Sequence, residues 1–409
     1  MTKKTVNLVM AVANDGGNGF AKTYTQFENG ISSTTITPSL YTPIPSQENI
    51  PAELDNTNWG ELDNNMDVVI KSSTLKTTSE LLVGTAAVNT GNTVTYNVES
   101  NIGKVDPDIT LIIPLVKVAY AALNHILARE KSIPNTINVN LAYYLTCLPI
   151  SEYSNTKKRE ILHKKLTKGK HTVLIKNFSH DVKVNISLNT DNTYIYPEGI
   201  TAQIGLIYSA DNFPSFRNDD IYTNSPYKDG QDYSKAGNTL LIDIGDGTTD
   251  ISIINATHPL KGMGVNISLN QGTGTAAAAA SDQLQIDYPQ LGHYTRSVFL
   301  EHAARNNKEG QILRIKYLSP QIELLIKAIE TEIEKEFRKA NNDITTVVVL
   351  GGGTNLITNQ ERKAFQRMVD SLNPLTDHQR IWWIDSEHNQ LLNLDGLRVF
   401  LARKIGQNR

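Results

Sequence analysis

The stretch NTLLIDIGDGTTDISII, residues 238–254, places two runs rich in β-branched residues on either side of a Gly-Asp-Gly turn. This pattern is typical of a β-hairpin. Asp243 lies near the end of the first run, and Gly245, Gly247 and Thr248 lie in the turn. Glycines let backbone N–H groups approach an anion closely, a threonine hydroxyl adds a hydrogen bond, and a carboxylate behind them can hold a hydrated Mg²⁺. Taken alone, the stretch is explained equally well by an ordinary Asp-Gly hairpin.

A related turn occurs near the N-terminus, directly after a β-like run at residues 6–12. It contains Asp15, Gly16, Gly17 and Asn18, and Lys22 follows in the next run. Both turns read as strand, Asp, Gly, small residues and second strand, and roughly 230 residues separate them. We therefore predict a duplicated domain in which each half supplies one phosphate loop.

A third glycine-rich element follows the apolar run TVVVL at residues 346–350. This run ends in Gly351, Gly352 and Gly353, which suits close backbone approach to a flat or phosphorylated ligand. The sequence contains no G-x-x-x-x-G-K-[ST] pattern, which excludes a P-loop protein.

In this order, the three elements resemble the two phosphate loops and the adenosine loop of the actin, heat-shock-chaperone and sugar-kinase ATPase superfamily. Within it, the chain looks most like the bacterial actin-like proteins of the ParM type, which segregate plasmids. The resemblance runs from residue 5 to about 400, with further matches at LVGTAA (82–87), CLPISEY (147–153), YPEG (196–199) and NLDGL (393–397).

The resemblance implies an α/β fold with two RNase-H-like, actin-like domains around a nucleotide cleft. Domain I would comprise residues 1–209 and about 388–409, and domain II residues 210–387. Residues 28–80 are rich in Thr, Ser, Asn and Pro, and we expect a small, irregular inserted subdomain there.

The resemblance also assigns roles to individual residues, with ATP or GTP and Mg²⁺ as the ligands. Two carboxylates would hold Mg²⁺ through water, Asp15 and Asp243, and Asp243 would also serve catalysis. The phosphates would be wrapped by Gly16, Gly17, Asn18, Gly245, Gly247 and Thr248, and the adenosine by Gly351–Gly353. The first loop lacks the Ser or Thr often found there in the family. Lys22 could replace that phosphate contact or could face solvent. Gly272, before a predicted helix opening at residues 276–280, lies beside the nucleotide in this reading or simply caps the helix.

Glu198 follows Pro197 at the end of a predicted strand and lies at the start of a predicted helix, residues 199–208. By the resemblance it is the carboxylate that orients the attacking water, a role that hydrolysis requires in line with the γ-phosphate. The alternative is that a glutamate at a helix start only complements the helix dipole.

Periodicity predicts further elements. Apolar residues at helical spacing favour helices at 110–130 and 319–339, and a long β run covers 137–148. Ser151 is a candidate N-cap of a basic helix that carries Lys157, Lys158, Arg159, Lys164, Lys165, Lys168 and Lys170. That basic face is either simply solvated or a contact for a filament or adaptor.

Composition sets the remaining bounds. The chain has 409 residues, 39% hydrophobic and 20% charged, which suits a globular protein with two domains. Its net charge of −3 gives no basic field for direct contact with nucleic acid or acidic lipid. The single cysteine, Cys147, excludes an intrachain disulfide and fits the cytoplasm. The N-terminal apolar run is too short for a signal peptide. No uninterrupted run of 18 apolar residues occurs, so we expect no membrane span.

The leading hypothesis is therefore a cytoplasmic actin-like ATPase, possibly a GTPase, that assembles head to tail into filaments and moves plasmid DNA through a DNA-binding adaptor. The alternative is a non-polymerising kinase-like or chaperone-like ATPase, or a nucleotide switch without filaments, on the same fold.

Overall fold

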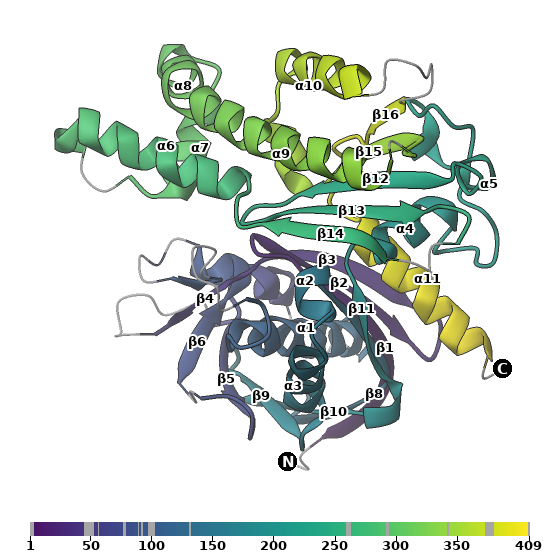
Figure 1. Ribbon diagram of the computed structural model, residues 1–409. Coiled ribbons are helices and arrows are strands. Elements are labelled where there is room, and N and C mark those ends of the chain that lie inside the picture. Colours follow the sequence, from purple (N-terminus) through teal and green to yellow (C-terminus); the bar gives the residue numbers. More distant parts are fainter. Residues whose placement is uncertain are drawn as a thin grey trace. The chain divides into compact units, whose positions relative to one another are not determined.

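The computed structural model describes residues 4–44, 53–55, 57–76, 79–88, 90, 93–96, 103–130, 132–258, 263–291, 294–341, 343–372 and 380–407. The chain forms two compact units (Figure 1). Unit 1 comprises Met1–Thr201 and Asn393–Arg409, and unit 2 comprises Ala202–Leu392. Both units combine a β-sheet with packed helices, which confirms the predicted α/β class.

Unit 1 is built on one curled sheet. Among the described residues its strands are β1 (Thr5–Gly16), β2 (Phe20–Phe27), β3 (Ser32–Pro38), β4 (Leu40–Pro43), β5 (Asp67–Lys71), β6 (Glu80–Val83), β7 (Val94–Thr95), β8 (Thr136–Leu148), β9 (His171–Ile175), β10 (Val182–Leu188) and β11 (Thr193–Pro197). The order is β3-β2-β1-β8-β10-β9-β5-β6-β4-β7, and β11 pairs with β8. Strands β1, β10 and β11 all run parallel to β8. The carboxyl ends of β1 and β11 lie beside that of β8, whereas β10 ends opposite Leu141.

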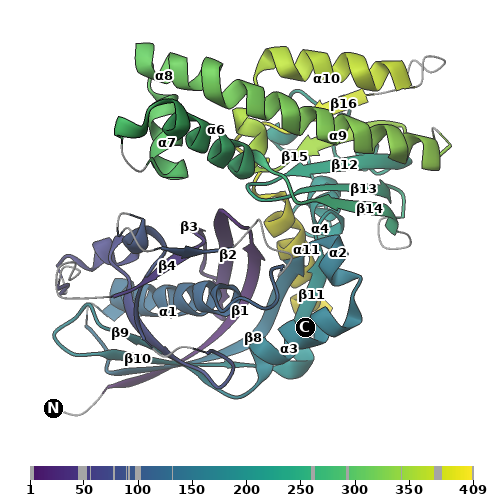
Figure 2. The same ribbon diagram turned by 60° about the vertical axis from the view of Figure 1, so that its left-hand side comes forward.

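The helices of unit 1 are α1 (Ile109–Glu130), α2 (Ile150–Tyr153), α3 (Thr156–Thr167) and α11 (Leu392–Gln407). Figure 2 shows α1 enclosed by the curled sheet, in agreement with the helix predicted at 110–130. By length and mean hydropathy α1 is long and apolar enough to cross a membrane. An uninterrupted apolar run is a different criterion, and α1 does not meet it. Its most apolar window is 83% buried in the protein, as is usual for a core helix.

Unit 2 has a five-stranded sheet in the order β14-β13-β12-β15-β16. Its strands are β12 (Asn238–Ile244), β13 (Thr249–Asn255), β14 (Met263–Leu269), β15 (Thr346–Leu350) and β16 (Arg380–Trp383). The helices are α5 (Gly230–Tyr233), α6 (Thr273–Asp287), α7 (Arg296–Ala304), α8 (Lys308–Ile312), α9 (Ser319–Lys339) and α10 (Asn359–Leu372). A π-helical turn lies at Leu313–Leu318, and α4 (Ile200–Ile207) carries the chain from unit 1 into unit 2. The predicted stripe on α9 is confirmed, because Ile322, Leu325, Ile329, Ile333 and Phe337 are all buried.

Two local predictions were wrong. Ser151 lies inside α2 and caps nothing. The basic helix α3 begins instead after Asn155, whose side chain accepts from the Lys158 N–H, and it ends at Thr167, before Lys168 and Lys170. Pro149 favours a helix start directly after it, but the chain first forms the short helix α2 and only then the basic helix α3.

The described part of residues 28–80 is also more regular than expected, while residues 45–52, 56 and 77–78 lie outside the described residues. Strand β3 continues the first hairpin as its third antiparallel strand, and β4, β5 and β6 extend the same sheet. Their polar, Thr-rich composition is typical of a loop, yet β3 lies at the sheet edge, where most of its residues can remain exposed and Thr37 alone of the strand is buried.

Candidate functional site

The first predicted phosphate loop is the turn between β1 and β2, which pair with Asp15 opposite Lys22. Asp15 is buried, and Lys22 Nζ lies 3.0 Å from its Oδ2 atom. Lys22 therefore does not face solvent freely. Its side chain stays at the loop, because it forms an ion pair with the Asp15 carboxylate. A Cβ atom at Gly17 would lie 2.5 Å from the carbonyl oxygen of Phe20, so only glycine fits there.

Ser39, which lies outside this loop, donates two hydrogen bonds to it. Its hydroxyl donates to the Gly17 carbonyl at 2.7 Å, and its backbone N–H donates to the Gly19 carbonyl at 2.9 Å. Gly16 and Asn18 are half-buried in the same turn. The loop that carries these residues is thus held in one conformation by neighbouring backbone.

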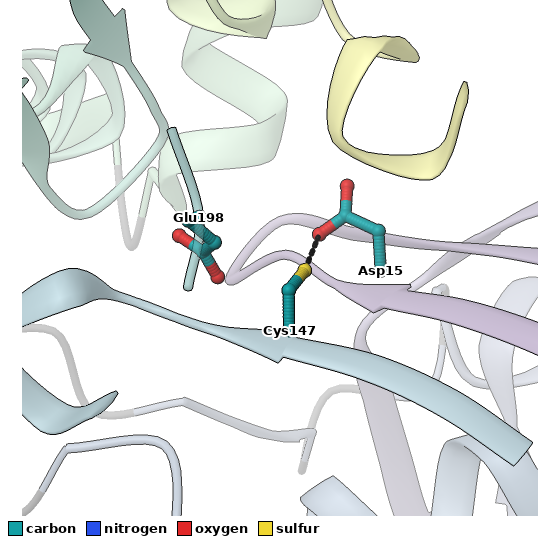
Figure 3. Close-up of side chains that lie close together, drawn as sticks. All are labelled: Asp15, Cys147 and Glu198. Atoms are coloured by element: carbon teal, nitrogen blue, oxygen red, sulfur yellow. Dashed lines mark hydrogen bonds between the residues drawn. The ribbon is translucent and has the colours of Figure 1, made fainter. Parts of the chain in front are cut away.

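Parallel pairing brings three side chains together at the carboxyl ends of the strands (Figure 3). Cys147 lies on β8 beside β1, and its Sγ donates to Asp15 Oδ1 at 3.6 Å. Glu198 follows β11, and its N–H donates to the Leu148 carbonyl at 2.8 Å. One ligand atom each from Asp15, Cys147 and Glu198 lie within 4.8 Å of one another, and all three residues are buried. Carboxyl ends of parallel strands are where α/β folds place their ligands.

One further lysine, which sequence reasoning does not single out, completes this group. Lys104 Nζ lies 2.9 Å from Glu198 Oε1, and Lys104 is 8% exposed. Burial by itself would lower the pKa of Lys104, but the charges of Glu198 and Asp15 outweigh it and raise the pKa above its usual value. Burial, reinforced by the same two carboxylates, raises the pKa of the Cys147 thiol.

The YPEG and NLDGL motifs, which lie almost 200 residues apart, meet beside Glu198. Asn393 Oδ1 accepts from the Gly199 N–H at 3.3 Å and from Thr201 Oγ1 at 2.7 Å. A Cβ atom at Gly396 would lie 1.8 Å from the Thr201 carbonyl oxygen, so α11 packs directly on the start of α4. Helix α4 begins at Ile200, one residue later than predicted. Glu198 therefore precedes the helix and does not lie in its first turn.

Unit 2 contains the second predicted loop, the turn between β12 and β13, with Ile244 opposite Thr249. The Gly245 N–H donates to the Thr248 carbonyl at 2.9 Å. The start of α6 packs onto this turn, because the N–H groups of Thr273 and Gly274 donate to the carbonyls of Gly245 and Asp246 at 3.1 and 2.8 Å. The first amides of α6 therefore fasten the loop rather than point freely outward.

The glycine loop after β15 lies against the same turn. Gly351 has a φ of +94°, and a Cβ atom there would lie 2.3 Å from Asp243 Oδ1. A Cβ at Gly353 would lie 2.6 Å from the Ile244 carbonyl oxygen, and one at Gly272 equally close to the Gly245 carbonyl. Gly352 differs, since a Cβ atom there would have Gln390 Cβ as its nearest neighbour, at 3.7 Å. Three of these four glycines are thus required by protein packing, whereas a Cβ atom at Gly352 would make only ordinary van der Waals contact.

Comparison with known proteins gives a result at the level of the fold. No protein-family model matches the sequence, and no curated protein matches it. Among solved structures, the actin-like protein Alp7A is 16% identical with a TM-score of 0.65, covering 98% of both chains. A 15-stranded ParM filament from Clostridium botulinum is 17% identical with a TM-score of 0.61, covering 97% of this chain and 99% of that one.

The chain has the actin-like fold. The archaeal actin homologue Ta0583 in complex with ADP is also similar, at 17% identity and a TM-score of 0.57 over 97% of this chain and 99% of that one. The expected two-domain actin-like architecture is therefore confirmed. The individual binding and catalytic residues remain predictions. Within this actin-like chain, Asp15 and Glu198 lie together in unit 1, and Asp243, Gly245, Gly272, Gly351 and Gly353 lie together in unit 2.

Proposed function

We propose that this actin-like protein binds ATP or GTP with Mg²⁺, hydrolyses it and assembles into filaments with copies of itself. The observation that carries the proposal is the buried pair Asp15 and Glu198 beside a glycine turn, at the carboxyl ends of parallel strands. Each carboxylate is paired with a lysine, Asp15 with Lys22 and Glu198 with Lys104, which offsets the cost of its burial. In an actin-like fold, this position supports phosphate chemistry.

The residues present fit a nucleotide and Mg²⁺. Mg²⁺ prefers oxygen ligands and retains several waters, so Asp15 and Asp243 would hold it through water, and the Cys147 thiol would not be a ligand. The turns at Gly16–Asn18 and Gly245–Thr248 would contact the phosphates with backbone N–H groups. Gly352 is less crowded than its neighbours, with Gln390 at van der Waals distance, and this would suit the flat face of the adenosine or guanosine.

Hydrolysis needs one group that orients the attacking water. Glu198 can accept a hydrogen bond from that water, and its ion pair with Lys104 holds the carboxylate in one place. Bound Mg²⁺ would neutralise charge on the phosphates during their transfer. Asp15 is held in turn by Lys22 and Cys147, so the side chains around the reacting phosphate are fixed before a nucleotide binds.

Assembly is the second part of the proposal. Head-to-tail contacts that do not close into a ring generate filaments. The net charge of −3 gives no overall basic field that attracts DNA, so movement of plasmid DNA would require an adaptor protein in the cytoplasm.

The test is sedimentation and light scattering of the purified protein with ATP, GTP, their non-hydrolysable analogues or no nucleotide, with phosphate release measured in parallel. We expect polymer with a nucleoside triphosphate, and longer-lived polymer with the analogue. A protein that releases phosphate but stays monomeric with every nucleotide would instead support the kinase-like or chaperone-like alternative. Absence of nucleotide binding would overturn the proposal as a whole.

A further inference from the structure

A series of linked charged residues connects Glu198, at the strand ends, to helix α3. Lys104 contacts Glu198 at 2.9 Å, and Glu152 Oε1 accepts from the Lys104 backbone N–H at 2.7 Å. Glu152 is itself buried and lies 3.5 Å from Lys158 Nζ on α3. The loop that precedes α1 is thereby linked to α2 and α3.

The backbone at Lys104 is fixed on both sides. Gly103 has a φ of +75°, and a Cβ atom there would lie 2.5 Å from Glu152 Oε1, so this position requires glycine. The Lys104 carbonyl accepts from the Thr110 hydroxyl, which in turn contacts the Tyr96 hydroxyl at 3.1 Å. These contacts leave the Lys104 side chain directed at one acceptor, the Glu198 carboxylate.

Unit 1 holds another buried lysine for comparison. Lys117 on α1 is 2% exposed and lies 2.6 Å from Asp63 Oδ1, well removed in sequence from every predicted site residue. Both lysines are buried and paired with a carboxylate, but the Asp63 side chain is 33% exposed whereas that of Glu198 is 7% exposed, so Lys117 controls for the loss of a buried lysine and not for the whole pair. Only the partner of Lys104 is a predicted catalytic group.

We propose that Lys104 is a positioning residue for hydrolysis, which holds the Glu198 carboxylate in one orientation toward the attacking water. This inference rests on the proposed function. A buried carboxylate without its cation tends to rotate toward another donor, and it then orients water poorly.

The experiment compares phosphate release and nucleotide affinity in the full-length protein with Lys104→Met, Glu198→Gln, the double variant and Lys117→Met. We expect Lys104→Met to lower kcat by about 10- to 100-fold, the size typical for a supporting residue, with nucleotide affinity nearly unchanged. The double variant should be no slower than Glu198→Gln, because both changes remove one function. Lys117→Met should be less stable but should retain the wild-type kcat.

Gly103→Ala provides an independent variant that keeps every charge. Its new Cβ would meet the Glu152 carboxylate, which accepts from the Lys104 N–H, and alanine is strained at a φ of +75°, so we expect the Lys104 backbone to shift and kcat to fall here as well. This variant also tests the positioning role of Lys104 if Lys104→Met does not fold.

Wild-type kcat in Lys104→Met or in Gly103→Ala, while Glu198→Gln is slow, would overturn this inference and leave the proposed function intact. A double variant slower than Glu198→Gln by the full Lys104→Met factor would also overturn it. Wild-type phosphate release from Glu198→Gln would overturn the catalytic assignment itself, and this inference with it.

Discussion

Replacing Gly351 by alanine should damage the glycine loop, whereas the same change at Gly352 should be tolerated. The two residues are neighbours after β15, and both were predicted to contact the nucleotide. They differ in their surroundings, since a Cβ at Gly351 would lie 2.3 Å from Asp243 Oδ1 and 2.4 Å from the Ile244 carbonyl oxygen. At Gly352 the nearest atom is Gln390 Cβ at 3.7 Å, an ordinary van der Waals distance.

The magnitude follows from two contributions. A residue other than glycine at a φ of +94° is strained by about 1–3 kcal/mol. Forcing a methyl group into a filled space typically adds about 1–3 kcal/mol, because Asp243 and the end of β12 must move. We therefore expect Gly351→Ala to lower the free energy of unfolding by about 2–5 kcal/mol. Gly352→Ala should change it by no more than about 0.5 kcal/mol.

Urea unfolding of both variants and the wild type, followed by circular dichroism, measures the stability difference. Nucleotide binding with Mg²⁺ then separates two effects. Gly351→Ala should bind more weakly because Asp243 is displaced, and Gly352→Ala should bind more weakly only if the nucleoside lies on that glycine. Equal stability of the two variants would refute the reasoning, since it would mean that the close contacts at Gly351 do not restrict the loop.

Three further predictions address the carboxylates. Asp15→Asn and Asp243→Asn should each weaken nucleotide binding in the presence of Mg²⁺ and should have little effect in EDTA, as measured by calorimetry; equal losses with and without the metal would exclude a role in holding it. Glu198→Ala should slow phosphate release by about 10²–10⁴-fold while polymer still forms and persists longer; rapid depolymerisation of this variant would contradict that role. Burial, followed by the charge of Glu80 and a hydrogen bond to it, raises the pKa of Asp67 from 3.8 to about 7. The folded chain then keeps a proton that the unfolded chain loses, so stability should fall by up to about 4 kcal/mol as the pH rises from 4 to 7 and should then level off. Asp67→Asn should flatten this profile in urea unfolding at pH 5 and 8.

Several elements could be predicted from the sequence because their signals are local. The two hairpins follow from β-branched runs on either side of glycine turns, and the structure pairs Asp15 with Lys22 and Ile244 with Thr249 as those turns require. Helix α9 follows from its apolar stripe. In each case the residues that decide the element lie within one or two turns of each other, so their order in the chain carries the information.

The environment of Glu198 is of another kind. Its partner Lys104 lies 94 residues earlier in a loop without periodicity, and Cys147 approaches Asp15 from a strand 132 residues away. Nothing near Lys104 in the sequence distinguishes it from a surface lysine, because its burial is produced by Glu152, Thr110 and the carboxyl ends of β1, β8 and β11. Sequence therefore determined which turns and strands could form and which carboxylates follow them. The pairing of each carboxylate with its lysine was decided only by the tertiary structure, because parallel strand pairing brings distant segments to one edge and burial then requires every charge there to find an opposite one.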